Sequence, residues 1–316
     1  MSKQSPSPTK SISIIVPVWN ERGNLPILID EINKTFQPLP YTYSIIFVED
    51  SSTDGTLEYI KQQAETTNYL FYISLTKSFG HQNALKAALD RTTSDAVVMM
   101  DGDMQHPPAL IPELLAKWED GYDIVYTIRN DHKDINLFKK KTSQIFYEVI
   151  NNLSDIKIEQ GTADFRLMDQ KVVNVFRTFT ESDIFLRGLI KWMGFKQIGI
   201  EYTSALRASG ESKYTLKKMM RFALQGITSF TTKPLYLAAY FGMFFAMLSL
   251  LYIPYIIYSL YYGHTVSGWA SVIATIAFFG GLQLMILGII GIYLGKLFMQ
   301  SKQRPHYIIK ETNLPE

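Results

Sequence analysis

Residues 235–295 are 61 consecutive positions without Asp, Glu, Lys or Arg, and this run constrains the fold more than any other feature of the sequence. A helix that crosses a bilayer needs about 20 apolar residues, so the run accommodates two. The polar turn at residues 262–268 separates them. A buried hairpin of a soluble protein has a similar composition, but two charge-free helices of this length favour a membrane hairpin.

Basic residues flank this run on both sides, whereas the turn inside it has none. Lys and Arg are enriched on the cytoplasmic side of membrane segments. We therefore expect a multi-pass protein of the inner (cytoplasmic) membrane, with both termini and the large N-terminal domain in the cytoplasm. The basic residues are Lys213, Lys217, Lys218, Arg221 and Lys233 before the run and Lys296, Lys302 and Arg304 after it.

The composition narrows the range of partners. A net charge of +2 over 316 residues gives no indication of nucleic-acid binding. The chain has no cysteine, so disulfide bonds and thiolate nucleophiles are excluded, as is typical of a reducing compartment. Residues 1–10 are polar, rich in Pro and Ser, and lack the apolar core of a signal peptide, so we expect a disordered tail.

Apolar runs alternate with helical patterns between residues 11 and 127. This order predicts an α/β domain with a mostly parallel, Rossmann-like sheet and helices on both of its faces. The expected strands are residues 11–18, 43–49, 69–75, 95–100 and 123–127, and the expected helices are residues 25–35, 56–64, 82–91 and 108–119.

The chain divides further by composition. We assign residues 11–211 to the α/β domain, 234–296 to the membrane hairpin and 297–316 to a cytoplasmic tail. Residues 212–233 mix basic residues with Leu, Met and Phe at helical spacing, which indicates either a helix lying in the membrane plane or an ordinary domain helix; its position before the hairpin favours the first. Glycines along residues 280–295 permit close helix packing, so we expect a homo-oligomer, with a tetramer as the first guess.

Acidic residues follow two of the expected strands. Asp50 ends the run 43–49, and Asp101 and Asp103 end the run 95–100. Ligands of open α/β sheets bind beyond the carboxyl ends of the strands, so we expect these acids in one crevice. The D-x-D spacing suits a hard divalent cation that also holds substrate phosphates. The pattern suggests a nucleotide-sugar site, and the hairpin suggests a lipid as the other substrate.

Seven segments in order carry a resemblance over nearly the whole chain. The sequence resembles family 2 glycosyltransferases of the GT-A fold, and within them the membrane-anchored polyprenyl-phosphate glycosyltransferases that load dolichol phosphate with mannose or undecaprenyl phosphate with glucose or modified sugars. The segments are IIVPVWNE (14–21), VEDSSTDGT (48–56), LTKSFGHQNAL (75–85), MDGDMQHPP (100–108), GYDIVYTIRN (121–130), GTADFRLMD (161–169) and RASGESKY (207–214).

The resemblance implies a nucleotide-sugar site. It assigns Asp50 to the nucleotide, although a helix N-cap is an alternative role for this residue. Relatives often have Asp-Gly-Ser where this chain has Asp50-Ser51-Ser52, a change that alters the turn. The other residues implied around the donor are Pro17, Trp19, Glu21, Val48, Lys77, Asp101, Gly102 and Asp103.

The resemblance also implies a metal site. Asp103 would bind Mg²⁺ or Mn²⁺ directly, Gln105 would assist, and Asp101 would lie nearer the nucleotide. The metal would neutralise the departing nucleoside diphosphate. Gly102 stands where relatives commonly have alanine, and the smaller residue should be tolerated. The histidines at 81, 106 and 264 form no metal-ligand pattern, and we assign them no role.

Asp164 is the catalytic-base candidate that the resemblance provides. A phosphomonoester has a second pKa near ~6, so a polyprenyl phosphate is already a nucleophile at cytoplasmic pH, and Asp164 would then orient a substrate instead. A buried structural pair with Arg166 is the alternative. Two phosphate-bearing substrates also require cations, for which we expect Arg129, Arg207 and Lys213.

We therefore expect an inverting transfer of a hexose from a nucleotide sugar to a polyprenyl phosphate. UDP-glucose and undecaprenyl phosphate are the first choices. GDP-mannose, UDP-N-acetylglucosamine or a modified arabinose donor remain alternatives, as does, in a different class, a non-catalytic membrane scaffold or a lipid-sugar translocation partner.

Overall fold

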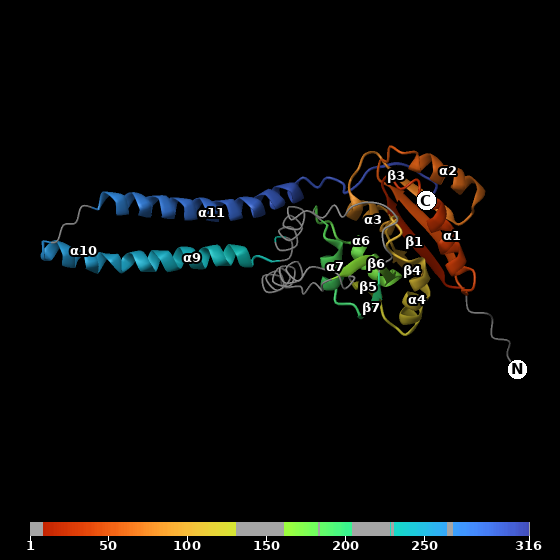
Figure 1. Cartoon of the computed structure of the whole chain (residues 1–316), viewed down its shortest axis with the longest axis horizontal. Coiled ribbons are helices and arrows are strands. Elements are labelled where there is room, and N and C mark those ends of the chain that lie inside the picture. Colours follow the sequence, from red (N-terminus) through yellow and green to blue (C-terminus); the bar gives the residue numbers. More distant parts are fainter. Residues whose placement is uncertain are drawn as a thin grey trace.

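One eight-stranded sheet organises the N-terminal part of the protein, and a pair of long helical rods extends from it (Figure 1). The computed structural model describes residues 9–130, 161–182, 184–203, 228, 231–263 and 268–315. The strand order is β7-β5-β6-β4-β1-β2-β3-β8. Only β6 and β8 run against the other strands of this sheet, which confirms the expected mostly parallel α/β architecture.

The described helices and strands lie close to the expected ranges up to residue 127, and β1 matches its range at both ends. In chain order they are β1 Ser11–Val18, α1 Leu25–Phe36, β2 Thr42–Glu49, α2 Thr56–Thr66, β3 Leu70–Leu75, α3 His81–Leu89, β4 Ala96–Met99, the 3-10 helix η1 Pro108–Leu110, α4 Ile111–Glu119, β5 Ile124–Asn130, β6 Thr162–Asp169, α6 Gln170–Arg177, α7 Leu186–Trp192, β7 Gln197–Thr203, α9 Lys233–Leu250, α10 Tyr252–Tyr261, α11 Trp269–Ser301 and β8 Ile309–Thr312.

The sheet is covered on both faces. One apolar cluster joins α1, α2 and α4 to the face that carries Ile14 and Val16, and a second joins α3, α6 and α7 to the face that carries Ile15. Successive strand residues point to opposite faces, so the unbroken apolar run of β1 supplies both clusters. Two-sided burial leaves the carboxyl ends of the strands as the accessible edge.

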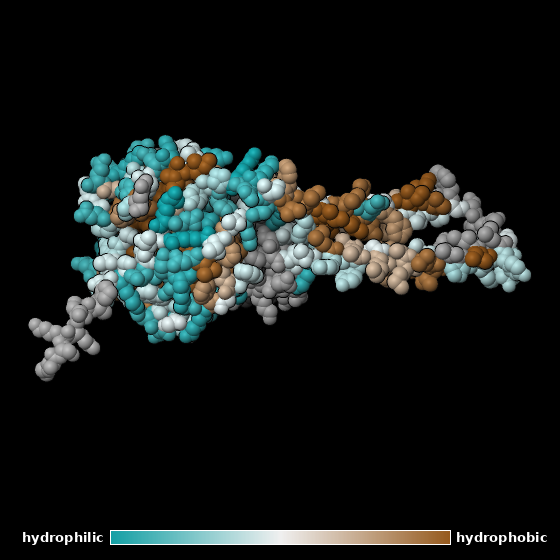
Figure 2. All heavy atoms as spheres, turned by 180° about the vertical axis from the view of Figure 1, so that it is seen from behind, coloured by the Kyte–Doolittle hydropathy of each residue, from teal (hydrophilic) through white to brown (hydrophobic). Residues whose placement is uncertain are grey.

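The apolar run of the sequence forms helices that are almost entirely exposed. The most apolar 18-residue stretches of the helices at 233–250 and 271–301 have mean hydropathies of 1.3 and 2.2, and 6% and 0% of the residues in these stretches are buried. Phe245 of α9 packs on Phe278 and Phe279 of α11. Hydrophobic side chains dominate this part of the surface (Figure 2). By length and composition both helices could cross a membrane.

The C-terminal segment differs from the expected tail. Residues 297–301 continue α11, and β8 then pairs antiparallel with β3 at the edge of the sheet, where the Thr76 N–H donates to the Ile308 carbonyl (3.0 Å). Tyr307, Ile309 and Leu314 pack against the second cluster. An unpaired β3 edge would expose backbone donors and acceptors, and β8 covers it. Within residues 297–316, which the sequence assigned to a cytoplasmic tail, the segment 309–312 is therefore part of the sheet.

Several predictions lie outside the described residues. Arg207, Lys213 and nearly all of the proposed juxtamembrane helix at 212–233 belong to this group, as do residues 1–8 of the N-terminal tail.

Candidate active site

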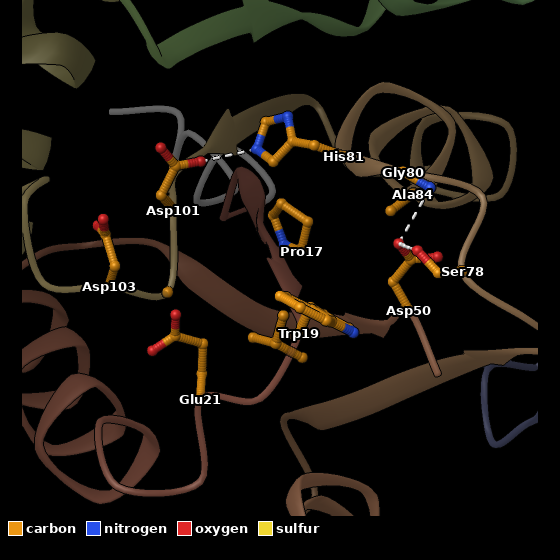
Figure 3. A pocket seen from close by; sticks show the side chains of 12 residues that line it. Pro17, Trp19, Glu21, Asp50, Ser78, Gly80, His81, Ala84, Asp101 and Asp103 are labelled. Atoms are coloured by element: carbon orange, nitrogen blue, oxygen red, sulfur yellow. Dashed lines mark hydrogen bonds and ion pairs between the residues drawn. The ribbon is translucent and has the colours of Figure 1, made fainter. Parts of the chain in front are cut away.

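The carboxyl ends of β1, β2 and β4 meet the start of α3 around an open cleft of about 450 Å³ (Figure 3). The parallel register of β1 with β2 and β4 brings these ends together, as expected from the sequence. The cleft is lined by Pro17, Val18, Trp19, Glu21, Asp50, Ser78, Gly80, His81, Ala84, Asp101, Gly102 and Asp103.

Asp50 lines the cleft but is engaged by the protein itself. Its carboxylate accepts hydrogen bonds from Ser78 Oγ (2.7 Å) and from the N–H groups of Phe79 (2.7 Å) and Gly80 (3.0 Å). It therefore holds the loop that leads into α3. Ser51, at the position where relatives often have glycine, adopts a φ of 63°, so the turn keeps a left-handed conformation without that glycine.

The other expected nucleotide-site residues separate into two groups. Trp19 is 58% exposed at the cleft and offers a flat apolar surface there. Val48 is 0% exposed in the second apolar cluster, so its side chain does not reach the cleft. Lys77 places its ammonium 5.1 Å from the ring centre of Phe79 and is not among the lining residues.

Glu21 contributes a third carboxylate beside Asp101 and Asp103 (Figure 3). Burial raises its pKa, the hydrogen bond from Asn24 lowers it, and the charges of Asp103, Asp54 and Asp101 raise it again, with a net increase. Mutual repulsion of these acids makes the cleft favourable for a cation.

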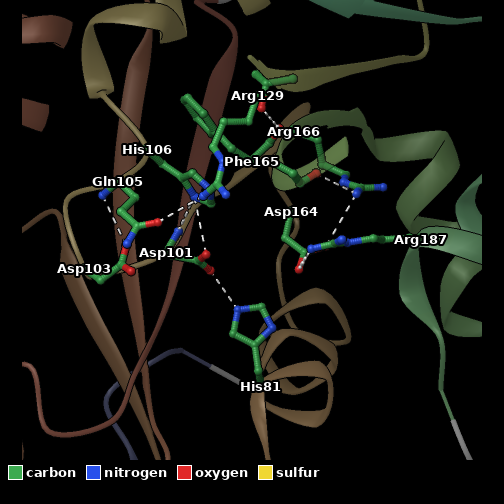
Figure 4. A network of polar contacts seen from close by, with 12 residues as sticks. His81, Asp101, Asp103, Gln105, His106, Arg129, Asp164, Phe165, Arg166 and Arg187 are labelled. Carbon is green, nitrogen blue, oxygen red and sulfur yellow. Dashed lines mark hydrogen bonds and ion pairs between the residues drawn. The ribbon is translucent and has the colours of Figure 1, made fainter. Parts of the chain in front are cut away.

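Asp101 is held by two histidines (Figure 4). His81 Nε2 donates to Asp101 Oδ1 (2.8 Å), and the Asp101 N–H donates to His106 Nδ1 (2.9 Å). Burial alone would raise the pKa of the Asp101 carboxyl, but the His81 hydrogen bond and the charges of both histidines bring it below its usual value. The His106 ring also stacks on Phe165 with ring centres 5.3 Å apart. Asp101 is thus a fixed anion.

Asp103, the expected metal ligand, lines the cleft, and Gln105, its expected assistant, is hydrogen-bonded to it through the backbone. Asp103 Oδ1 accepts the Gln105 N–H (3.1 Å). The Gln105 side chain accepts from Arg129 (3.3 Å) through Oε1, while its buried Nε2 lacks a hydrogen-bond partner in the described part of the chain. The described residues contain no group of three or more His, Cys, Asp or Glu that could hold a metal alone. Mg²⁺ commonly takes one or two carboxylates plus substrate phosphates, so these residues fit a metal that the substrate completes.

Gly102 allows the ends of β4 and β1 to approach closely. A Cβ on Gly102 would lie 3.0 Å from Cγ1 of Val18 and 3.6 Å from the Pro17 carbonyl. The glycine therefore determines how near Asp101 and Asp103 lie to the residues that end β1.

Asp164 lies at the back of the site, on β6, and is 8% exposed. Arg187 binds it with both arms of its guanidinium, Nε to Oδ1 at 2.7 Å and Nη2 to Oδ2 at 2.8 Å. The Nη2 atom of Arg166 is farther from Asp164 Oδ1, at 3.5 Å. Burial favours a raised pKa for Asp164, but the charge and hydrogen bonds of Arg187, followed by the charge of Arg166, hold the pKa well below its usual range. Arg166 is therefore the lesser partner.

Three residues of the site were missed from the sequence. His81 lies inside the segment 75–85, which the resemblance already included, and His106 adjoins Gln105. Their contacts with Asp101 depend on tertiary packing. Arg187 comes from α7, 23 positions after Asp164, and no local pattern joins the two.

Comparison with known proteins identifies the family to which this chain belongs. Residues 13–176 match the family described as Glycosyl transferase family 2. The chain is 38% identical over 300 residues to the bactoprenol glucosyl transferase of Shigella phage SfX, covering 95% of this chain and 98% of the relative. It is also 38% identical over 301 residues to the uncharacterized glycosyltransferase YkcC of Bacillus subtilis (strain 168), covering 95% and 93%. The chain therefore belongs to glycosyltransferase family 2.

A solved structure supports the same fold. The mannosyltransferase PcManGT from Pyrobaculum calidifontis, in complex with GDP-Man and Mn2+, matches with a TM-score of 0.51 at 16% identity, covering 94% of this chain and 88% of that chain. The fold is GT-A-like, and membership of the family makes this protein a transferase enzyme. A non-catalytic scaffold is thereby excluded.

Proposed function

We propose that this enzyme transfers a hexose from a nucleotide sugar to a polyprenyl phosphate at the cytoplasmic face of a membrane, with inversion at the anomeric carbon. UDP-glucose and undecaprenyl phosphate are the substrates we favour. The proposal rests on the similarity to a bactoprenol glucosyl transferase, which extends over 98% of that relative and includes both the cleft and the two apolar helices.

The donor would occupy the cleft. Trp19 offers a stacking surface for the base, and the acids beyond β4 lie where a diphosphate and its metal would be held. Asp103, assisted by Gln105, would hold Mg²⁺ or Mn²⁺. When bound, the metal would supply Lewis-acid stabilisation of the leaving nucleoside diphosphate. Asp101, fixed by His81, would orient the donor beside it.

The acceptor requires little activation. A lipid phosphate oxygen attacks the anomeric carbon, the bond from that carbon to the diphosphate breaks, and the nucleoside diphosphate leaves. Because the second pKa of a phosphomonoester is near ~6, the attacking oxygen carries no proton through most of the cytoplasmic pH range. Asp164 is held ionised by Arg187 and would contribute a fixed negative charge that orients the sugar or acceptor.

The apolar helices would bring the acceptor to the site. We propose that residues 233–261 and α11 cross the membrane, which their low burial and high hydropathy support. Lys233 and Lys296 lie near the domain ends of these helices, and the Tyr293 hydroxyl donates to the Thr231 carbonyl (2.8 Å) beside them. Packing through the glycines of α11 would produce a homo-oligomer, for which chemical crosslinking in membranes is the test.

Product analysis tests the proposal. The purified full chain would receive undecaprenyl phosphate, Mg²⁺ or Mn²⁺, and UDP-glucose, GDP-mannose or UDP-N-acetylglucosamine in parallel. We expect a glucosylated lipid phosphate by mass spectrometry and a β-linkage by NMR from the α-linked donor. An α-linked product would contradict inversion, and consumption of GDP-mannose alone would contradict the donor assignment. Nucleotide release without any glycosylated lipid would contradict the acceptor.

A further inference from the structure

The carboxylate of Asp164 is held by residues from two different elements. β6 supplies Asp164 and Arg166, and α7 supplies Arg187 (Figure 4). Arg187 reaches both carboxylate oxygens, at 2.7 and 2.8 Å. Such a two-armed contact fixes the rotation of a carboxylate as well as its position.

Arg166 cannot provide the same restraint. One of its nitrogens, Nη2, is directed to the Ala163 carbonyl at 2.9 Å and only more distantly to Asp164 Oδ1 at 3.5 Å. Its buried Nε has no hydrogen-bond partner among the residues that the structure describes. Arg166 thus contributes charge near one oxygen of Asp164 but no second arm, so the orientation of the carboxylate depends on Arg187.

Asp164 does not line the donor cleft, but it interacts electrostatically with two residues that do. These residues are His81 on α3, whose charge lowers the pKa of Asp164, and Asp101 after β4, whose pKa is raised by the charge of Asp164. In Figure 4 Asp164 lies between Arg187 on one side and the His81–Asp101 pair on the other. A change in the orientation or charge of Asp164 would therefore alter the electrostatic environment of two residues that line the cleft.

We propose that Arg187 is a positioning residue for the transfer reaction: it holds the Asp164 carboxylate in one orientation near the His81–Asp101 pair that lines the donor cleft. The predicted effect on kcat rests on the proposed function. The ion pair between Arg187 and Asp164 does not depend on it.

The energetics favour this role over that of a base. A carboxylate that is 8% exposed is costly without a partner, so the Asp164 charge depends on its cations. The pKa of Asp164 is well below its usual range because Arg187, followed by Arg166, offsets burial. A general base works best with a pKa near the operating pH, which this carboxyl does not have. Without Arg187, only Arg166 and His81 lower the pKa of Asp164, whereas burial and the negative charge of Asp101 raise it. The pKa of Asp164 should therefore rise in an Arg187 variant.

Kinetics of five variants test the proposal. Arg187→Met should lower kcat about 100-fold with the donor KM within about threefold, and Arg187→Lys, which keeps the charge but loses the fork, should lose only about tenfold. Asp164→Asn should lose at least as much kcat as Arg187→Met. Because the two residues act as a unit, the double variant Asp164→Asn/Arg187→Met should lie within about threefold of Asp164→Asn alone.

Arg177→Met is the matched control. Arg177 is also an arginine of the helical layer, but it binds the carbonyls of Leu89 and Thr92 and the side chain of Asn174, none of them in the cleft. It should lower the melting temperature while leaving kcat within about threefold of the wild type. If Arg187→Met does no more to kcat than Arg177→Met, Arg187 is only structural and the proposal is wrong.

An NMR titration, which needs no turnover, tests the Arg187–Asp164 ion pair independently of the proposed function. With ¹³C-carboxyl aspartate, the Asp164 resonance is identified by its loss in Asp164→Asn. We expect no titration of it between pH 5 and 8 in the wild type and a titration displaced to higher pH in Arg187→Met. An unchanged resonance in Arg187→Met would overturn the pairing. If the wild type glycosylates no lipid but Arg187→Met still shows the displaced titration, the proposed acceptor is overturned and the pairing is supported.

Discussion

Gly102→Ala tests whether the close approach of β4 to β1 shapes the cleft. The added Cβ would lie 3.0 Å from Cγ1 of Val18, a buried side chain in the first apolar cluster. Carbon atoms pack at about 3.5–4.0 Å, so Val18 must move by roughly 0.5 Å or more. Its β-branched side chain has few alternative rotamers to absorb this shift.

The expected change in the free energy of unfolding of Gly102→Ala is the sum of two opposing contributions. Overpacking a buried site costs about 1–3 kcal/mol. Alanine reduces the freedom of the unfolded chain relative to glycine and so returns about 0.4–1 kcal/mol, since Gly102 does not have a positive φ. The free energy of unfolding should therefore fall by about 0.5–2 kcal/mol, or roughly 2–6 °C in melting temperature.

Thermal unfolding of the purified chain, combined with a double-mutant cycle, measures the contact. Val18→Ala alone should cost about 2 kcal/mol because it leaves a cavity. The Gly102→Ala/Val18→Ala variant should be more stable than the sum of the single changes predicts, by about 1 kcal/mol or more, because the clashing methyl is gone and the new one fills part of its space.

The control is Gly23→Ala, where an added Cβ meets nothing within 4 Å. Its melting temperature should stay within about 1–2 °C of the wild type. A Gly102→Ala enzyme as stable as Gly23→Ala, or strictly additive effects in the cycle, would show that Val18 yields freely and would refute the steric reasoning.

Four further outcomes are expected. Asp103→Asn should lower lipid glycosylation at least about 100-fold at saturating Mn²⁺, and near wild-type turnover would contradict its assignment to the metal. Trp19→Ala should raise the donor KM about tenfold with little change in kcat, whereas Trp19→Phe should stay close to the wild type; equal KM values for both would exclude stacking. Tyr307→Phe loses hydroxyl bonds to Asp90 and Arg91 (both 2.9 Å) and should lower the melting temperature by about 3–6 °C, against no change if β8 were dispensable. Because the lowered pKa keeps Asp164 ionised as pH falls, the acid limb of kcat should follow the acceptor phosphate near ~6, and a limb set by Asp164 would refute this.

The strands and helices were predictable because hydrophobic periodicity and turn-forming residues are properties of short, local segments of the sequence. The apolar run of β1 and the acids after β2 and β4 placed Asp50, Asp101 and Asp103 at one edge of the sheet, and the structure brings them there. The rule that ligands bind at the carboxyl ends of parallel strands made this step possible.

What could not be predicted depends on contacts between distant segments. The fork of Arg187 on Asp164, the histidines on Asp101 and the loop bonds of Asp50 are set by how helices pack on the sheet. None of these contacts produces a periodic pattern in the sequence. Val48 shows a second limit, since the resemblance assigns its position to the site, whereas only the structure shows that its side chain is buried in the second apolar cluster.

The position of β8 also determines when the domain can be completed during synthesis. β8 is translated after both apolar helices, yet it must return to β3, which was made more than 200 residues earlier. Until then the β3 edge has no strand partner, and Tyr307, Ile309 and Leu314 are missing from the second apolar cluster. Closure of the sheet is therefore delayed until both apolar helices have left the ribosome, so the catalytic domain is completed only after these helices have been made.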